Sequence, residues 1–263
     1  MMKAKSLLVF VLACALLVAG CSAVPPNSDM PEAVPSTGLP STCTPSAANP
    51  PMDYTLYGGD ILRVGSQGYE KCRINADTAQ KYAGLISDAA DALAGETQVY
   101  CLIIPTSYGI LLPDEVKARL SDYEDTEACI SEVYAALSEN AKPVRVWDKL
   151  KAHSDEFIYF RTDLHWTARG AYLGYEAFCN AKGIAPIPLE AHRSVNFEGF
   201  FGTFYSESGG DEKFSPAETI EAFYPVSDGV TLTVTDADDN TTDCPIVADV
   251  SELHALAKYR TFS

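Results

Sequence analysis

The stretch that decides the fold lies at residues 157–167 and reads FIYFRTDLHWT. Residues 157–160 are apolar or aromatic, which is typical of a short buried strand. After a polar turn, residues 168–182 carry apolar side chains at helical spacing, and Thr167 stands in the position of an N-cap. The chain is therefore predicted to pass from strand to helix here, at the kind of edge where open α/β sheets place their chemistry.

Asp163 and His165 are the candidate catalytic residues at this edge. If the backbone stays extended, residues two apart point to the same side, so the carboxylate and the imidazole can serve one site. Imidazole changes protonation near neutral pH and suits a general base, which a carboxylate can orient. A capping Asp and a packed His beside Trp166 would explain the same spacing without any chemistry, and the residues alone leave both interpretations open.

The same stretch resembles the signature of the bacterial DHHW proteins. The resemblance rests on Thr162, Asp163, residues 165–167 and residues 170–172, while Leu164 stands where the family name expects its first His. Those proteins resemble the SGNH-hydrolase-like alginate O-acetyltransferases, in which an Asp-x-His pair supplies two thirds of a Ser-His-Asp triad and a residue other than His is tolerated between them. The resemblance implies that the Asp orients the His and that both are catalytic.

From about residue 58 to the C-terminus the resemblance is weaker, and it implies an SGNH-hydrolase-like, flavodoxin-like parallel sheet with flanking helices. Apolar spacing separately predicts helices at residues 75–94 and 127–140 and buried strands at residues 98–104 and 143–147. This alternation implies parallel strands with right-handed crossovers, which residues 157–160 would join as a neighbour. Later segments, at residues 199–205, 218–224 and 230–235, are predicted to form an antiparallel β excursion.

A nucleophile is missing from this pattern. In the proteins that carry the resemblance, a serine follows the Asp-x-His motif in a block of Gly-Asp-Ser or Asp-Ser-Tyr type, and nothing of that kind follows Trp166. Ser107, which ends a predicted buried strand before the motif, is the alternative within the chain. We therefore expect the C-terminal part of the domain to be incomplete and the chain as written to be inactive.

The N-terminus has the features of a targeting segment. A basic start precedes an apolar run at residues 7–18 that is too short to span a bilayer comfortably. Residues 18–21 resemble a bacterial lipoprotein processing box, so residues 1–20 are interpreted as a lipoprotein signal peptide and Cys21 as the lipidation site. An ordinary signal peptide or a lone membrane anchor is the alternative. Two acyl chains are the number usually needed for stable anchoring.

Residues 21–52 are rich in Pro, Ser and Thr and poor in large apolar side chains, which predicts a disordered tether. Residues 53–263 are long enough for one domain with a sizeable core. The formal net charge is −17. Such an acidic chain argues against nucleic acid as a partner and favours solubility outside the cell. We therefore expect an extracytoplasmic protein that is lipid-anchored to the bacterial cell membrane.

Other candidate sites are few. A metal site built on Asp163 and His165 would need a further ligand, and no Cys/His spacing offers one, so neither a metal nor a cofactor is expected. Trp166 and Tyr205 are candidate substrate-binding residues, because the aromatic stretch at residues 197–205 could line a sugar-binding groove. Core packing is the competing explanation for that stretch.

Two functions remain in competition. By resemblance, the reaction would be O-acetyl transfer or ester hydrolysis on acyl esters of a cell-surface glycan, with a membrane-bound acyl donor protein as a partner. The alternative is a non-catalytic acidic surface lipoprotein that binds carbohydrate. A serine block of Gly-Asp-Ser type in the downstream reading frame would distinguish the first function from the second.

Overall fold

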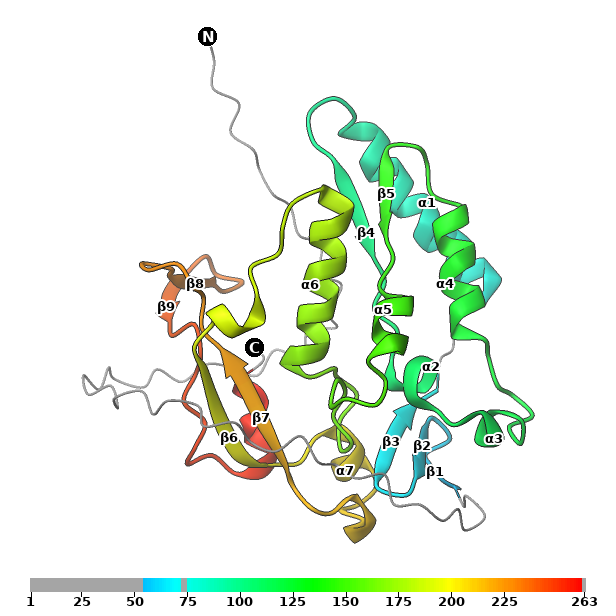
Figure 1. Cartoon of the computed structure of the whole chain (residues 1–263), viewed down its shortest axis with the longest axis vertical. Helices are drawn as coiled ribbons and strands as arrows, with labels where there is room; N and C mark the ends of the chain where they lie inside the picture. The colour runs from blue at the N-terminus through cyan, green and yellow to red at the C-terminus, as the bar shows by residue number, and fades with distance from the viewer. Residues whose placement is uncertain (1–53, 72–74, 262–263) are drawn as a thin grey trace. The chain divides into compact units, whose positions relative to one another are not determined.

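The computed structural model describes residues 54–71 and 75–261, all within the compact unit Pro51–Ser263 (Figure 1). The predicted signal peptide, Cys21 and the tether lie outside the described residues, so those interpretations stay predictions. In the described part of the chain, no helix combines the length and the apolar character needed to cross a membrane.

The described elements are helices, short 3-10 turns and short strands. The helices and 3-10 turns are α1 (Ala76–Ala92), α2 (Ser107–Leu111), α3 (Asp114–Lys117), α4 (Thr126–Ala135), α5 (Trp147–Ala152), α6 (Ala168–Lys182), η1 (Leu189–Ala191), α7 (Thr203–Glu207), η2 (Glu212–Phe214) and η3 (Ala255–Thr261). The strands are β1 (Tyr54–Tyr57), β2 (Ile61–Val64), β3 (Gln67–Glu70), β4 (Val99–Leu102), β5 (Ala141–Val144), β6 (Ser194–Phe200), β7 (Glu218–Phe223), β8 (Leu232–Thr235) and β9 (Thr241–Cys244).

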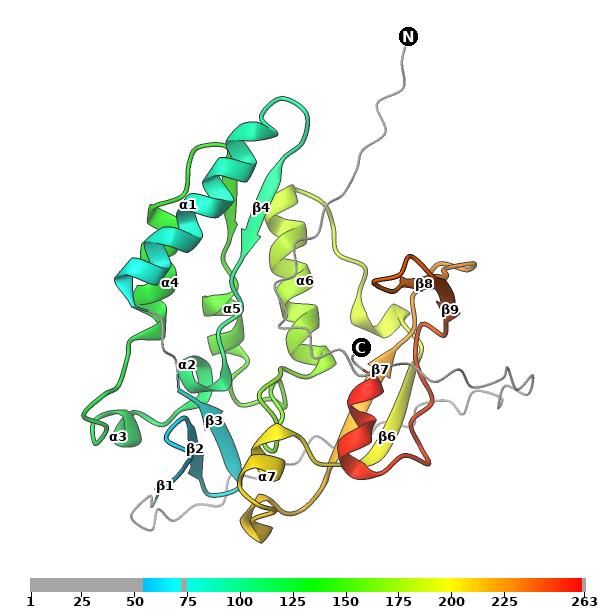
Figure 2. The same ribbon diagram turned by 180° about the vertical axis from the view of Figure 1, so that it is seen from behind.

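The first α/β layer follows the periodicity of the sequence. β4 and β5 pair in parallel, as predicted. The predicted bounds 143–147 are wrong, because β5 ends at Val144 and helix α5 begins at Trp147. α1 and α4 lie on one side of this strand pair and α6 on the other (Figure 1 and Figure 2). Asn75 is the N-cap of α1, and its side chain accepts the N–H of Thr78 at 2.9 Å. Thr167 is the N-cap of α6, where its side chain accepts the N–H of Gly170, and Gly183 is the C-cap with a left-handed φ of 74°. Local capping residues therefore set these helix ends.

The predicted third parallel strand at residues 157–160 is wrong. Tyr159 forms a single antiparallel bridge with Trp166, and the N–H of Phe160 donates to the carbonyl of His165 at 3.2 Å. The chain therefore doubles back on itself instead of extending the β4–β5 sheet. Tyr159 and Phe160 are only 2% and 1% exposed. Residues 158–160 are apolar because they are buried in the core, whereas Phe157 is exposed. A short apolar run does not reveal its hydrogen-bond partners.

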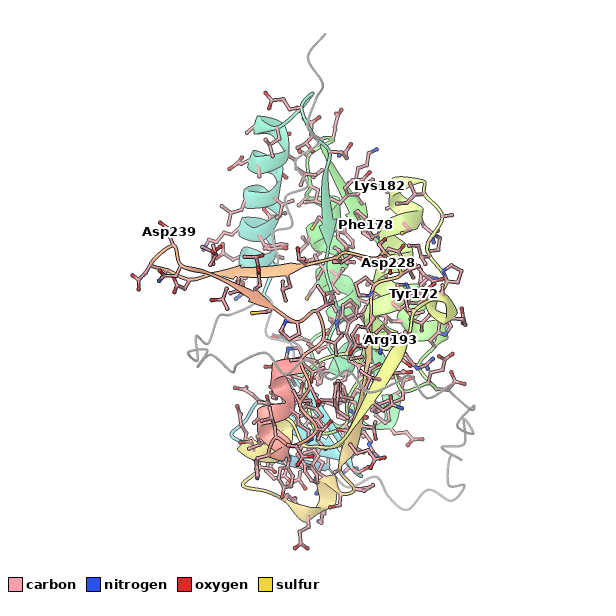
Figure 3. The ribbon with its side chains drawn as sticks, turned by 90° about the vertical axis from the view of Figure 1, so that its left-hand side faces the viewer. Tyr172, Phe178, Lys182, Arg193, Asp228 and Asp239 are labelled. Atoms are coloured by element: carbon pink, nitrogen blue, oxygen red, sulfur yellow. The ribbon has the colours of Figure 1, made fainter. Side chains whose placement is uncertain are left out.

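The remaining strands are antiparallel. β1, β2 and β3 form a three-stranded sheet that the sequence analysis did not predict, whereas β6–β7 and β8–β9 confirm the expected antiparallel excursion. The predicted β segment at residues 199–205 is wrong in its second half, because β6 ends at Phe200 and helix α7 begins at Thr203. In Figure 3 the β8–β9 hairpin extends away from the neighbouring ribbon, with Asp239 at its tip.

The fold is thus a mixed α/β structure with a small parallel sheet and antiparallel strands. Within the described residues the parallel sheet has two strands, so the larger flavodoxin-like sheet that the resemblance implied is not observed. Tyr159 packs in the apolar cluster of β5 and α6, and Phe160 packs with Phe200 and Ile220 of β6 and β7. The turn that carries Asp163 follows these residues directly, so the two clusters fix the chain where the turn begins.

Candidate functional site

Asp163 and His165 form a close pair. The Nδ1 of His165 lies 2.6 Å from Oδ1 of Asp163, and the same oxygen accepts the backbone N–H of His165 at 2.9 Å. The sequence analysis assumed an extended backbone here, and this assumption is wrong. Instead, the carboxylate folds back onto the residue two positions later, in the way that Asp often does in turns. The side chain of Asp163 is fully buried, and that of His165 is 40% exposed.

The second oxygen of Asp163 is held by the start of α7. Oδ2 accepts the N–H of Thr203 at 2.8 Å. The neighbouring residue must be glycine, because a Cβ on Gly202 would lie 2.2 Å from that same oxygen. Both carboxylate oxygens are thus satisfied, and the contact with His165 has a fixed direction. A buried, fully bonded carboxylate beside a partly exposed imidazole is the arrangement by which a carboxylate orients a general base.

The backbone just before Asp163 is held by a second buried carboxylate. Glu218 accepts the N–H of Arg161 at 2.7 Å, the N–H of Thr162 at 2.8 Å and the hydroxyl of Thr162 at 2.5 Å. The Thr162 oxygen in turn accepts the N–H of Gly202 at 3.1 Å. Sequence reasoning missed Glu218, since a single acidic residue at the start of a predicted strand gives no signal.

A tyrosine from the C-terminal helix η3 lies beside the imidazole. The rings of His165 and Tyr259 meet edge to face, with centroids 5.7 Å apart. The Tyr259 hydroxyl is 2.7 Å from Oγ1 of Thr203, and its ring also contacts Phe200 at 5.6 Å. The helix η3 therefore borders the candidate site. No feature of the sequence indicated this neighbour.

The electrostatic surroundings of the pair are acidic. Burial raises the pKa of Glu70 above its usual range, and the negative charges of Glu207 and Asp60 raise it further. Asp163 adds to this increase, whereas His165 acts in the opposite direction. The charges of Asp163 and His165 therefore both act on the pKa of Glu70, which lies at the end of β3. A site with this surplus of negative charge favours cationic or neutral groups over anionic ones.

The two predicted substrate-binding residues occupy different surroundings. Trp166 packs onto α6, where a Cβ on Gly174 would lie 2.7 Å from its ring. That contact is structural packing. Tyr205 stacks on Phe201 with ring centroids 4.2 Å apart, and its N–H donates to the carbonyl of Thr162 at 3.3 Å. Tyr205 is therefore tied to the turn through its backbone, and both assignments to substrate binding stay predictions.

Ser107, the alternative nucleophile, is the first residue of α2. It is 1% exposed, and its hydroxyl donates to the carbonyl of Gly68 at 3.3 Å. This burial and this bond suit a structural role. Among residues 54–71 and 75–261, no group of three or more His, Cys, Asp or Glu side chains is arranged to hold a metal ion.

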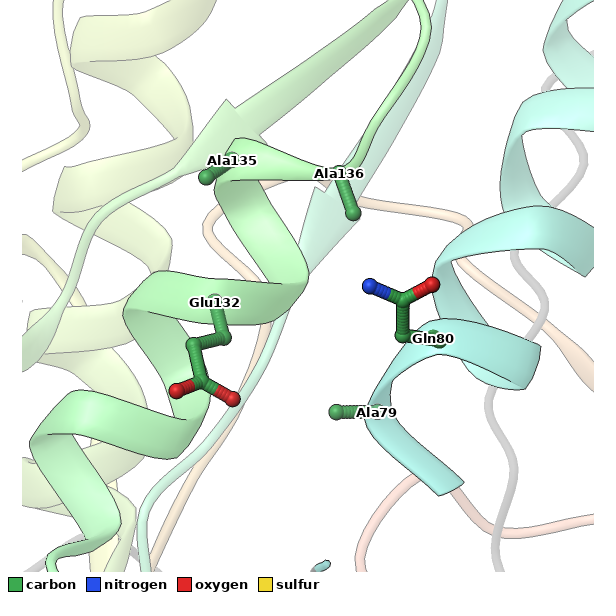
Figure 4. A pocket seen from close by; sticks show the side chains of 5 residues that line it. All are labelled: Ala79, Gln80, Glu132, Ala135 and Ala136. Carbon is green, nitrogen blue, oxygen red and sulfur yellow. The ribbon is translucent and has the colours of Figure 1, made fainter. Parts of the chain in front are cut away.

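A surface pocket lies elsewhere on the molecule, between α1 and α4 (Figure 4). Its lining residues are Ala79, Gln80, Glu132, Ala135 and Ala136. None of them belongs to the Asp163 turn or to α7, so this pocket is separate from the candidate site.

Comparison with known proteins agrees with the resemblance read from the motif. Residues 46–263 match the family model described as DHHW protein. No curated protein matches the chain. Among solved structures, a DHHW family protein from Eubacterium siraeum is similar, with 22% identity and a TM-score of 0.68; the match covers 80% of this chain and 69% of that one.

Two structures of Bacillus cereus PatB1 are also similar. One has 15% identity and a TM-score of 0.57, covering 80% of this chain and 72% of that one. The other, PatB1 with a sulfonyl adduct, has 16% identity and a TM-score of 0.56, covering 73% of this chain and 64% of that one. At these identities the likeness shows a shared fold.

Proposed function

The chain belongs to the DHHW protein family, and from the geometry of its Asp163–His165 pair we propose that it is an SGNH-like relative of O-acetyltransferases and esterases that act on cell-surface glycans. The observation that carries this proposal is the 2.6 Å contact between a fully buried carboxylate and a partly exposed imidazole. In acyl transfer this arrangement lets the imidazole take the proton of a hydroxyl nucleophile.

Each member of the pair has a defined task in this chemistry. Asp163 accepts the Nδ1–H of His165, which leaves Nε2 as the atom that receives a proton. As the hydroxyl oxygen attacks the acyl carbonyl carbon, its proton passes to Nε2, and the nearby carboxylate stabilises the imidazolium that forms. The same proton is then returned to the leaving group. The solved PatB1 with a sulfonyl adduct is consistent with a nucleophilic site on this fold.

The serine that attacks is proposed to come from outside residues 1–263. The hydroxyl of Ser107 is buried against the Gly68 carbonyl, and that of Ser208 donates to the carbonyl of Tyr205 at 2.7 Å. Loss of the nucleophile alone costs a triad enzyme on the order of 10⁶ in kcat. Residues 1–263 by themselves are therefore proposed to be inactive on acetyl esters.

The test uses two reagents on the full chain. p-Nitrophenyl acetate reports turnover, and phenylmethylsulfonyl fluoride followed by intact-mass measurement reports an activated hydroxyl. The wild type and His165→Ala should behave identically in both assays. If the downstream reading frame supplies a serine block, the extended chain should gain turnover that His165→Ala abolishes and Asp163→Asn sharply reduces. Robust, His165-dependent turnover by residues 1–263 alone would show that a serine already present is the nucleophile.

Location and partners are proposed from the N-terminal sequence. Lipidation of Cys21 would hold the domain outside the cytoplasm on the bacterial membrane, near a membrane-bound acyl donor protein and the glycan. The wild type should fractionate with membranes, and Cys21→Ala should be released into the medium. A soluble wild type with an unmodified Cys21 thiol would contradict the anchoring.

Carbohydrate binding without turnover is the second candidate, and the stacked Phe201–Tyr205 pair favours it. Aromatic faces are a common surface for sugars, because one side of a sugar ring is largely apolar. If Tyr205→Ala abolishes binding of an acetylated glycan by the extended chain while His165→Ala changes neither binding nor turnover, the non-catalytic function is correct.

A further inference from the structure

We propose that Glu218 is a positioning residue for the Asp163–His165 pair: its buried carboxylate fixes the Arg161–Thr162 backbone so that Asp163 points at Nδ1 of His165. This inference rests on the proposed function, because the pair that it positions is the proposed base and its orienting carboxylate. Glu218 is the first residue of β7, and the bonds described above join its carboxylate to Arg161 and Thr162, the two residues that precede Asp163.

The carboxylate of Glu218 accepts hydrogen bonds from two consecutive residues. Its side chain is fully buried, and one oxygen accepts the N–H of Arg161 while the other accepts both the N–H and the hydroxyl of Thr162. The Arg161 guanidinium, 3.4 Å away, supplies a positive charge from the surface. Hydrogen bonds to a carboxylate are short and strong, so these two consecutive peptide units are held in one orientation.

A chain of hydrogen bonds, which we call the relay, connects Glu218 through Thr162 and Gly202 to Thr203, the donor to the second oxygen of Asp163. By binding the Thr162 hydrogen, Glu218 turns the Thr162 oxygen into an acceptor for the N–H of Gly202 at 3.1 Å. The next N–H along, that of Thr203, donates to Oδ2 of Asp163. Glu218 therefore fixes the carboxylate from two sides: through the backbone that precedes Asp163 and through the loop that donates to it.

The experiment observes the imidazole directly. In the full chain labelled with ¹⁵N-histidine, long-range ¹H–¹⁵N spectra report the tautomer of each His ring, and His165→Ala assigns the signal of interest. The wild type should show His165 as the Nδ1–H tautomer with a downfield Nδ1–H proton. In Glu218→Gln the amide NH₂ must face one of the donors that the carboxylate accepted. We expect loss of the downfield proton and a mixture of tautomers, with the far-UV circular dichroism unchanged.

Glu221→Gln is the matched control. Glu221 lies on the same strand and bonds Arg169 at 2.7 and 3.0 Å, on an exposed ion pair. This variant removes the same charge and should leave the His165 signal as in the wild type. If Glu218→Gln folds and keeps the wild-type signal, the positioning role is overturned.

A second pair of variants decides the matter if Glu218→Gln does not fold. Thr162→Val removes the hydroxyl of the relay at nearly constant shape, and Thr162→Ser retains it. Loss of the Nδ1–H signal in the first and its retention in the second supports the proposal. An unchanged signal in Thr162→Val overturns it. If Thr162→Val also fails to fold while Thr162→Ser folds, the bonds between Glu218 and Thr162 stabilise the fold rather than position the pair. That result also overturns the proposal.

This readout needs no turnover, so it separates the two proposals. A wild-type signal that Glu218→Gln removes, in an extended chain that never transfers an acyl group, would support the positioning role and contradict the proposed function. If the extended chain transfers an acyl group and Glu218→Gln changes neither this activity nor the His165 tautomer, the proposed function is supported and the positioning role is contradicted.

Discussion

The turn at residues 161–166 and the β8–β9 hairpin show opposite relations between regular structure and burial. The turn has no regular secondary structure, yet Thr162 and Asp163 in it are fully buried. The hairpin is a regular antiparallel pair, yet all four residues of β8 are exposed. The turn is held by donors and acceptors that are 40 and 56 residues away in sequence. A regular backbone pattern is therefore a poor guide to which segment is held firmly.

Asp163 in the turn and Asp236 in the hairpin make similar hydrogen bonds but differ in burial. Asp163 accepts the backbone N–H groups of His165 and Thr203 while buried. Asp236, at the end of the hairpin, accepts the N–H groups of Asp238 and Asn240, each at 2.9 Å, while exposed. The bonds are alike in kind and number. Removal of an acceptor leaves a buried donor unsatisfied, whereas an exposed donor turns to water, so the energetic consequences should differ greatly.

The largest expected effect comes from filling the space beside Asp163. Gly202→Ala places a Cβ 2.2 Å from Oδ2 and 2.3 Å from Cβ of that residue, inside a buried bonded site. We expect the free energy of unfolding to fall by about 3 kcal/mol, the upper part of the usual range for overpacking. Urea unfolding followed by circular dichroism measures it.

Gly84→Ala is the control for this substitution. Gly84 lies within α1, and nothing lies within 4 Å of its added Cβ. Alanine is the better helix former, so the free energy of unfolding should rise by up to about 1 kcal/mol. A cost below about 1 kcal/mol for Gly202→Ala would mean that the turn yields easily, and the contrast with the hairpin would be lost.

Asp163→Asn should have the next largest effect. The amide supplies one acceptor oxygen and one NH₂ group, so the NH₂ faces either the N–H of Thr203 or that of His165. We expect a loss of about 2 kcal/mol in the free energy of unfolding, because one buried donor is left without an acceptor. Hydrogen exchange should accelerate at the amides of Thr203 and His165. Unchanged exchange at both would contradict the described bonding.

Glu70→Gln should have a smaller effect, of opposite sign. Burial and the charges of Glu207 and Asp60 raise the pKa of Glu70, so the folded state binds this proton more readily than the unfolded state does. The ionised carboxyl therefore lowers stability above the raised pKa, and this loss disappears below the ordinary value. Glu70→Gln should raise the urea midpoint at pH 7 and not at pH 4. The exposed Glu132→Gln should change neither midpoint.

The three long helices α1, α4 and α6 could be predicted from sequence because their signals are local, whereas the short helices α2, α3, α5 and α7 were not predicted. The predicted helix at residues 168–182 coincides with α6, and the predicted cap Thr167 is the observed one. The strand predicted at residues 157–160 failed for the opposite reason. Whether an apolar run pairs in a sheet depends on distant donors and acceptors. The N–H of Phe160 donates to His165, across a turn whose shape no periodicity describes.

The candidate site divides in the same way. Asp163 and His165 are two residues apart and stand in a motif, so sequence alone could single them out. Gly202 and Glu218 could not be found, because their roles exist only once the chain brings β6, β7 and α7 against the turn. Tyr259 could not be found either, because it lies 94 residues after His165 in sequence and contacts it only in the folded chain. Sequence therefore identified the chemical groups of the site, and the structure added the groups that hold them.

The smallest expected effect is that of Asp236→Asn, the hairpin's counterpart of Asp163→Asn. Hydrogen bonds from the Asn240 side chain and from nearby backbone N–H groups lower the pKa of Asp236. These bonds are therefore formed above the ordinary pKa and are lost as pH falls through the lowered one. Asp236 is exposed, so they contribute little to the free energy of unfolding. Asp236→Asn should leave the urea midpoint unchanged, because water replaces the lost acceptor. In NMR spectra the amide signals of Asp238 and Asn240 should titrate in the wild type and be constant in the variant. A drop in midpoint as large as that of Asp163→Asn would show that burial does not separate the two aspartates.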